Sequence, residues 1–174
     1  WELTDMMHIK AIEIIARSLR DSVKGDPEGR AQMALGQYIA GMGFSNVGLG
    51  IVHSMAHPLS AVYDIPHGVA CAILLTPVLK FNAPSTADKY RDIAVAMGVK
   101  NTEDMSIEQA RQACIEAVEK LSVDVGIPQK LTQLGVKEED LQFLSESAFV
   151  DACTPGNPRD VSVEAIKEIY KSIM

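Results

Sequence analysis

The sequence predicts an all-α protein, a bundle of about seven to nine helices, and three of its features favour this fold class. Of the 174 residues, 47% are hydrophobic but only 5% are aromatic. The apolar residues are mostly Ala, Ile, Leu, Val and Met, and frequent Ala and Met favour helices over sheets. Apolar residues also recur at spacings of three and four, which is the period of a helix. The length suffices for one buried core, so residues 1–174 are expected to form a single domain.

Two helices are predicted at the start of the chain. Apolar positions three and four apart indicate an amphipathic helix over residues 2–23, which the turn formers Gly25-Asp26-Pro27 end. A second helix should run from about Pro27 to Gly43. Its frequent Ala and Gly residues leave little side-chain bulk, so neighbouring helices are expected to pack closely against it.

The next helical segment, residues 44–63, contains a proline. Pro58 removes one helical hydrogen bond, so a kink or an early stop is expected there. Pro66, at a first helical position, then opens a helix that reaches about Lys80. Because this helix is hydrophobic nearly all round, it is predicted to be central and buried.

The second half of the sequence has the pattern of an ordinary helical bundle. Ser106 and Gln109 form a capping box, which predicts a helix starting there and ending near Val125. Helical periodicity bounded by turn formers predicts the other elements, which are helices over 85–97, 138–152 and 163–174 and one or two turns over 129–134. Residues 153–159, rich in Pro and Gly, are expected to form a rigid loop.

Composition excludes several classes of function. The net charge of −7 and a pI near 5.1 argue against a nucleic-acid partner, which would need clustered Lys and Arg. Cys71, Cys114 and Cys153 are odd in number and far apart, so neither a disulfide framework nor a thiolate zinc site is indicated. This cysteine usage predicts a reducing, cytoplasmic setting. No apolar run of eighteen residues and no signal peptide is seen, so neither a membrane partner nor export is expected.

Two weaker candidates for functional sites are better explained by structural roles. The glycines of residues 41–43 and 48–50 lack the strand and the βαβ unit that a dinucleotide-binding loop requires, so they are expected to permit close helix packing. His8 stands alone on a helix, and a structural role is expected for it.

The strongest sign of chemistry is a cluster of three histidines, His53, His57 and His67, within fifteen residues. Residues four apart share a helix face, so His53 and His57 would project together, and the turn at Pro66 can return His67 toward them. Burying three imidazoles without a metal or substrate would leave ring nitrogens that still need hydrogen-bond partners, and the protein would gain nothing in return. A divalent metal site is therefore predicted, and spacing allows either His53 with His57 or His53 with His67 as ligands.

The sequence around these histidines is distinctive. Residues 41–59 read GMGFSNVGLGIVHSMAHPL and residues 66–70 read PHGVA. Further along the chain are YRDIA at 90–94, DVGIP at 124–128 and CTPGNPR at 153–159. Together these motifs, which extend over essentially the whole chain, strongly resemble the iron-containing (group III) alcohol dehydrogenases.

The resemblance implies a protein larger than this chain. Members of the family have an amino-terminal α/β domain that holds NAD and an all-helical carboxy-terminal domain, of the dehydroquinate synthase type, that holds the metal. This chain is similar to the second domain alone. It is therefore expected to be truncated, to lack the nucleotide-binding domain and to be inactive by itself, while the parent enzyme is expected to be a homodimer.

The resemblance also assigns roles to residues. The family's metal site uses one Asp and three His, of which two correspond to His53 and His67. The other Asp and His are expected four apart on a helix upstream of this chain. His57 corresponds to an additional histidine beside the substrate and the nicotinamide, which is a catalytic and cofactor-contacting position rather than a ligand. Phe44 and Cys153 resemble positions that line the substrate pocket.

The implied chemistry is hydride transfer between NADH and a small aldehyde, such as lactaldehyde, to give an alcohol or diol. Fe²⁺, with Zn²⁺ as the alternative, would polarise the carbonyl oxygen. Two other functions stay open. One is a zinc-dependent enzyme that resembles glycerol dehydrogenase or dehydroquinate synthase, and the other is a non-catalytic helical module whose histidines satisfy one another.

Overall fold

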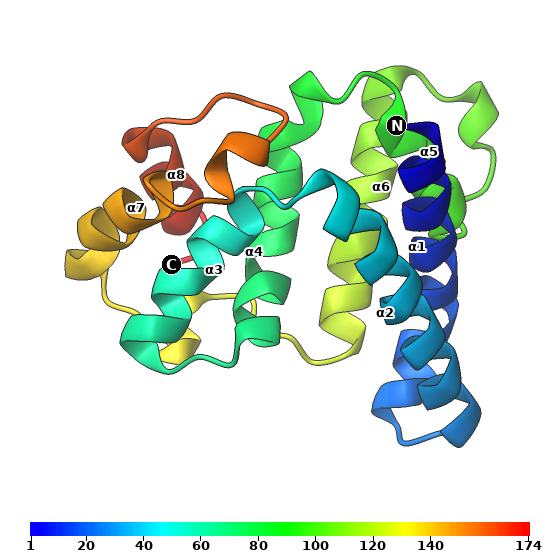
Figure 1. Ribbon diagram of the computed structural model, residues 1–174, viewed down its shortest axis with the longest axis horizontal. Helices are drawn as coiled ribbons and strands as arrows, with labels where there is room; N and C mark the ends of the chain where they lie inside the picture. The colour runs from blue at the N-terminus through cyan, green and yellow to red at the C-terminus, as the bar shows by residue number, and fades with distance from the viewer. The chain divides into compact units, whose positions relative to one another are not determined.

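The computed structural model describes residues 1–174 and contains eight α-helices and no strand, which confirms the predicted all-α fold (Figure 1). The helices are α1 (Glu2–Val23), α2 (Pro27–Val47), α3 (Ile51–Tyr63), α4 (His67–Asn82), α5 (Lys89–Ala96), α6 (Ile107–Asp124), α7 (Leu141–Phe149) and α8 (Val163–Lys171). Short 3₁₀ turns occupy Ala83–Ser85, Thr102–Asp104, Leu131–Leu134, Glu138–Asp140 and Thr154–Gly156.

Contacts divide the chain into two compact units, each assembled from two separate segments. The first unit consists of residues 1–48 and 86–125 and holds α1, α2, α5 and α6. The second consists of residues 49–85 and 126–174 and holds α3, α4, α7 and α8. The single domain expected from the sequence stays a prediction. All three clustered histidines belong to the second unit.

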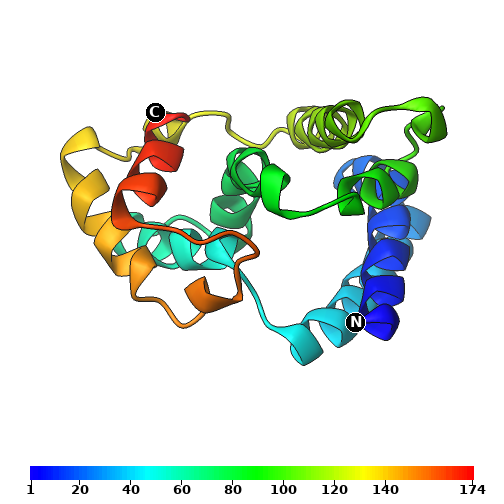
Figure 2. The same ribbon diagram turned by 90° about the horizontal axis from the view of Figure 1, so that it is seen from above.

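In the first unit, α1 and α2 form an antiparallel pair that lies side by side in both views (Figures 1 and 2). The chain reverses at Gly25, whose φ of 92° is a conformation that glycine adopts without strain. Asp26 then caps α2 by accepting a hydrogen bond from the Gly29 N–H at 2.6 Å. A β-carbon on Gly36 would come within 2.9 Å of the Ile15 side chain, so close packing through small residues is confirmed.

Helix α2 extends four residues beyond Gly43, where the sequence predicted its end. Gly43 is buried inside the helix, and a β-carbon there would lie 2.6 Å from the His8 Nε2 atom. The glycine therefore makes room for an imidazole from α1 rather than ending the helix. This contact gives His8 the structural role that was expected of it.

The core of the second unit is formed by α3, α4, α7 and α8. Tyr170 of α8 is its largest fully buried side chain, and its hydroxyl donates to the Met55 carbonyl of α3 at 2.6 Å. The inner face of α4 is buried as predicted, but Leu75 is 39% exposed, so the helix is not covered on every side. Residues 67–85 are long and apolar enough to cross a membrane, a test that core helices of soluble proteins also pass.

Proline positions differ in part from the prediction. Helix α3 does not stop at Pro58 but continues to Tyr63, and it ends where Asp64 takes a left-handed conformation with φ of 55°. Pro66 is the N-cap of α4 rather than its first residue. Because only one hydrogen bond is lost at an internal proline, packing of α3 on α4 and α7 is sufficient to keep the helix intact.

In the second half, the capping box of Ser106 and Gln109 is confirmed at the start of α6. Three predicted helices are shorter than expected, and one of them is α8, which ends at Lys171 rather than at residue 174. A 3₁₀ turn and a left-handed Ala87 precede α5, which delays its start to Lys89. Helix α7 follows a 3₁₀ turn and ends at Phe149, before the loop that carries Cys153.

Candidate metal centre

Helices α3 and α4 bring the three predicted histidines together. His53 and His57 are four residues apart on α3, and His67 is the first residue of α4. The ring centroids of His53 and His67 lie 5.5 Å apart, and those of His57 and His67 are also 5.5 Å apart. The two rings on α3 are 6.4 Å apart. Both ligand pairs that spacing left open are therefore close, and the pair that joins the two helices is the closer one.

The connection between the two helices explains this convergence. Only residues 64–66 separate them, and the left-handed Asp64 reverses the chain at the end of α3. Pro66 adopts an extended conformation with ψ of 129° and starts α4. The first turn of α4 thus returns beside α3, and His67 lies near the histidines of the preceding helix.

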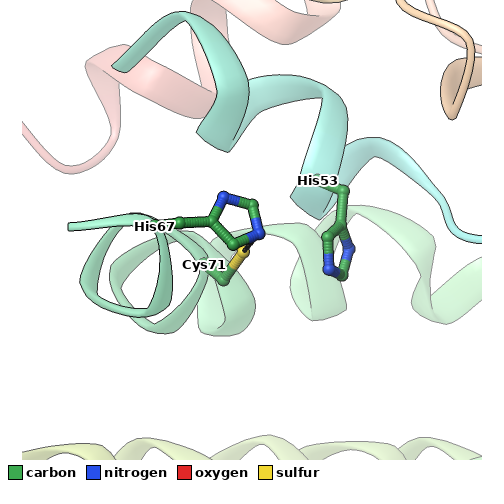
Figure 3. A group of neighbouring side chains, drawn as sticks. All are labelled: His53, His67 and Cys71. Carbon is green, nitrogen blue, oxygen red and sulfur yellow. Dashed lines mark hydrogen bonds between the residues drawn. The ribbon is translucent and has the colours of Figure 1, made fainter. Parts of the chain in front are cut away.

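Two of these histidines form a group with a cysteine. The ligand atoms of His53, His67 and Cys71 all lie within 4.8 Å of one another (Figure 3). Cys71 is one turn after His67 on α4, and its Sγ atom lies 3.5 Å from the His67 Nε2 atom. His53 reaches the same space from α3. We call these three residues the imidazole–thiol group.

The imidazole–thiol group fits a divalent metal ion by its chemistry, because imidazole binds iron and zinc, and thiolate binds zinc. Burial lowers the pKa of the His53 imidazole, and the neighbouring His67 and His57 lower it further. His53 is therefore neutral at physiological pH, which is the form that binds metal. Burial raises the pKa of the Cys71 thiol to about 11.

The third histidine belongs to a different group. The Nδ1 atom of His57 lies 2.7 Å from the carboxylate of Asp151, which follows α7 in the chain. Cys153 is close to both residues. Asp151 also accepts a hydrogen bond from the Cys153 backbone N–H at 2.8 Å. We call His57, Asp151 and Cys153 the carboxylate–histidine group. Its hydrogen bond to the carboxylate fixes which nitrogen of His57 carries a proton, and the Nε2 atom is left to meet a ligand.

The pKa values of both ionisable neighbours of His57, Asp151 and Cys153, differ from their usual values. Burial alone would raise the pKa of Asp151, but the hydrogen bonds from Cys153 and His57 outweigh it and hold that pKa below its usual value. The Cys153 thiol has a raised pKa, because of burial and the adjacent Asp151 carboxylate. At neutral pH the group therefore holds a carboxylate and a protonated thiol.

The loop that carries Cys153 is attached to the histidine helices at several points. The hydroxyls of Thr154 and Ser54 lie 2.8 Å apart, and Thr154 donates to the Ala148 carbonyl. Asn157 and Asn82 exchange two amide hydrogen bonds, at 2.8 and 2.9 Å. These contacts hold Asp151 and Cys153 against α3 although about a hundred residues separate them in sequence.

Sequence reasoning missed two residues of this centre. Cys71 had a usable signal, because it is four residues after His67 on a predicted helix and so shares its face. Asp151 had none, because its only link to the histidines is a tertiary contact across 94 residues.

The predicted substrate residues lie in different units. Cys153 is partly buried in the second unit, within the carboxylate–histidine group. Phe44 lies near the end of α2 in the first unit and is 42% exposed. Their roles in substrate binding stay predictions.

The depressed pKa of Asp151 predicts an acid-dependent loss of stability. The native interactions of the Asp151 carboxylate contribute their full stabilisation above its pKa in the unfolded chain, near 3.8. This stabilisation is lost as the pH falls from there through the lower pKa of the folded state. We expect Asp151→Asn to be less stable than the original protein at pH 7, with the difference shrinking below pH 4. Urea unfolding at pH 7, 5 and 3 measures this. The exposed Asp160, changed to Asn, is the control, and an equal difference at every pH would contradict the prediction.

The chain matches a known family over its whole length. The model of the Fe-containing alcohol dehydrogenase family, C-terminal part, matches residues 1–174. Lactaldehyde reductase from Escherichia coli (strain K12) is 60% identical over 170 residues, which are 98% of this chain and 44% of that protein. The 1,3-propanediol dehydrogenase of Citrobacter freundii is 43% identical over 171 residues, which are 97% of this chain and 44% of that protein.

Solved structures agree with these sequence matches. A crystal structure of 1,3-propanediol oxidoreductase superposes with a TM-score of 0.95 at 42% identity, covering 98% of this chain and 45% of that one. An alcohol dehydrogenase from Oenococcus oeni gives a TM-score of 0.94 at 37% identity and covers 99% and 45% of the two chains. This chain thus spans less than half the length of these relatives. It belongs to the Fe-containing alcohol dehydrogenase family, and it corresponds to the family's C-terminal part.

Proposed function

We propose that this chain is the metal-binding part of an NAD-linked, iron-dependent alcohol dehydrogenase that interconverts small aldehydes with alcohols or diols. The observation that carries the proposal is the meeting of His53 and His67, from two helices, beside a third histidine held by a carboxylate. Lactaldehyde is proposed as the substrate, because the chain is 60% identical to a lactaldehyde reductase. NAD would be held mainly by residues outside this chain.

In this proposal His53 and His67 hold the ion through neutral imidazole nitrogens. Bound there, Fe²⁺ supplies Lewis acidity toward a carbonyl oxygen. We propose that His57 stays outside the coordination sphere, as its resemblance to the family's additional histidine implies, with its Nδ1 atom engaged by Asp151. Its Nε2 atom then offers a hydrogen-bonding position beside the reacting group, where a small polar substrate or the nicotinamide amide can be oriented.

Metal-dependent stabilisation tests this proposal on the chain as it stands. An ion that binds only the native state stabilises it by about 2.7 kcal/mol at one hundred times its Kd, which predicts a rise in Tm of about 5–10 °C. We expect this rise with Fe²⁺ under anaerobic conditions. Mg²⁺ is the control, because it prefers oxygen ligands and should leave Tm unchanged.

Two outcomes would contradict the proposal. A Tm that Fe²⁺ leaves unchanged would favour a non-catalytic helical module. Reduction of lactaldehyde by NADH above the rate with metal alone, catalysed by this chain by itself, would show that no other part of the protein is needed to hold NAD.

A further inference from the structure

Only one of the three clustered histidines has a hydrogen bond to a carboxylate. The His57 Nδ1 atom lies 2.7 Å from the Asp151 Oδ2 atom, and the pair joins α3 to the loop after α7 across 94 residues of sequence. The Asp151 side chain is 19% exposed, whereas that of His57 is 44% exposed. The carboxylate is thus the more buried member of the pair, and part of the imidazole stays open to a ligand.

The protein fixes the carboxylate of Asp151 at both of its oxygens. Oδ2 contacts His57, and Oδ1 accepts a hydrogen bond from the Cys153 backbone N–H at 2.8 Å. The backbone of the same residue is held as well. The Asp151 N–H donates to the Ala148 carbonyl at 3.2 Å, and the Asp151 carbonyl accepts from the Thr154 N–H at 3.1 Å. The carboxylate therefore has a set orientation before any ligand binds.

The simplest alternative is an ordinary surface ion pair without a role in recognition. Lys24 and Asp21 form such a pair, three residues apart in sequence, with side chains that are 75% and 59% exposed. Pairs of this kind contribute little, because both side chains move freely in solvent. Asp151 differs, since it is largely buried and its second oxygen is bonded to the backbone. The contact with His57 therefore sets the orientation of the imidazole ring.

This contact also decides what the other ring nitrogen can bind. A neutral imidazole has one N–H donor and one acceptor nitrogen, and a carboxylate can only accept. Nδ1 of His57 must then be the donor, and Nε2 is an acceptor. An acceptor pairs with an O–H or N–H group and not with a carbonyl oxygen. In the proposed reaction, such donors are a hydroxyl of the alcohol or diol and the carboxamide of the nicotinamide.

We propose that Asp151 is a positioning residue that keeps His57 Nε2 a hydrogen-bond acceptor, so that the ring recognises an O–H or N–H donor of the substrate or the nicotinamide. The proposal rests on the proposed function for the place of His57 beside the reacting groups. It assigns a part in recognition to a residue that touches neither partner itself.

The second bond of Asp151 makes its replacement by Asn informative. An Asn side chain has one oxygen and one NH₂ group, and the Cys153 N–H needs the oxygen as its acceptor. The NH₂ group then faces His57 Nδ1 and donates to it, which moves the ring proton to Nε2. The ring would present a donor to a donor, although the size of residue 151 hardly changes.

Nuclear magnetic resonance on this chain tests the tautomer. Long-range ¹H–¹⁵N spectra at about pH 8.5, where histidine side chains are ordinarily neutral, show which nitrogen of His57 carries the proton. We expect Nδ1 in the original chain, Nε2 in Asp151→Asn, and Nδ1 again in Asp151→Glu, which restores a carboxylate. His57→Ala identifies the signals. The exposed Asp160, changed to Asn, is the matched control and should leave the tautomer unchanged.

A proton on Nε2 of His57 in the original chain would overturn the proposal. Because the original chain shows its tautomer without any substitution, this result does not depend on how well a variant folds. A proton that stays on Nδ1 in a folded Asp151→Asn variant would also overturn it, since the carboxylate would then not decide the tautomer.

Kinetics of a dehydrogenase that contains this part test the recognition, with propane-1,2-diol and NAD as substrates. Asp151→Asn should raise one KM about tenfold, which is the effect of losing one hydrogen bond made on binding. Its kcat should fall less than that of His57→Ala, because the ring still fills its place. A higher KM for the diol identifies a hydroxyl as the donor, and a higher KM for NAD identifies the carboxamide. Asp151→Glu should restore the KM to within about threefold of its original value.

The results separate this proposal from the function on which it rests. If both KM values stay unchanged in Asp151→Asn while the original dehydrogenase turns over, the recognition role is wrong and the proposed function stands. If the original dehydrogenase shows no NAD-linked turnover at all, the proposed function is wrong, and the recognition role is wrong with it.

Discussion

Replacing His53 or His67 with Ala should remove metal retention, whereas His57→Ala should leave the metal in place. Each of the first two residues supplies one of the two nitrogens proposed to hold the ion. Loss of a residue that hydrogen-bonds to a metal ligand typically weakens metal affinity by about 10–100-fold. Loss of a direct ligand should therefore weaken it by more than about a hundredfold. Metal analysis by mass spectrometry after dialysis, with each variant at equal concentration, measures the retained ion.

His57→Ala is expected to act on the reaction instead. In a dehydrogenase that contains this part, turnover should fall about a hundredfold while the metal content stays constant, because misplacing the reacting groups costs on this scale. His8→Ala is the matched control. His8 packs against Gly43 within the first unit, so its loss should change neither turnover nor metal content. If His57→Ala lost the metal while His53→Ala kept it, the two roles would have to be exchanged.

The helices were largely predictable because their signals are local. The turn formers at residues 25–27 and the capping box at Ser106 place helix ends through hydrogen bonds made within one turn. The errors arise where tertiary contacts decide. Gly43 suggested a helix end by its residue type, but it is buried against the His8 ring, and the helix continues past it.

The candidate site was predictable to a smaller degree. His53 and His67 are separated by one short turn, so the sequence alone indicated that their rings could meet. Asp151 reaches His57 only because the loop after α7 is attached to α3 and α4 through Thr154 and Asn157. Such long-range contacts leave no periodic trace in the sequence, so the sequence alone does not reveal that Asp151 is the partner of His57.

Tyr170 is the residue whose loss should disturb the histidine helix most. Its side chain is fully buried in the second unit, and its hydroxyl donates to the carbonyl of Met55, which lies between His53 and His57 on α3. Burial raises the pKa of this phenol, so it stays neutral and remains a donor at every physiological pH. A single side chain of α8 thus packs beneath the helix that presents two of the three histidines and also bonds to its backbone.

We expect Tyr170→Ala to lower the free energy of unfolding by about 3–5 kcal/mol, which is the usual cost of removing a buried aromatic ring. Tyr170→Phe keeps the ring and loses only the hydrogen bond, so it should cost about 1 kcal/mol. Urea unfolding measures both values, and hydrogen exchange should assign the loss to helices of the second unit, with α1 and α2 unchanged. Because α3 holds His53, the Ala variant should also bind metal more weakly than the Phe variant does. Equal destabilisation by the two substitutions would instead mean that the Met55 hydrogen bond, rather than the packing of the ring, keeps α3 in place.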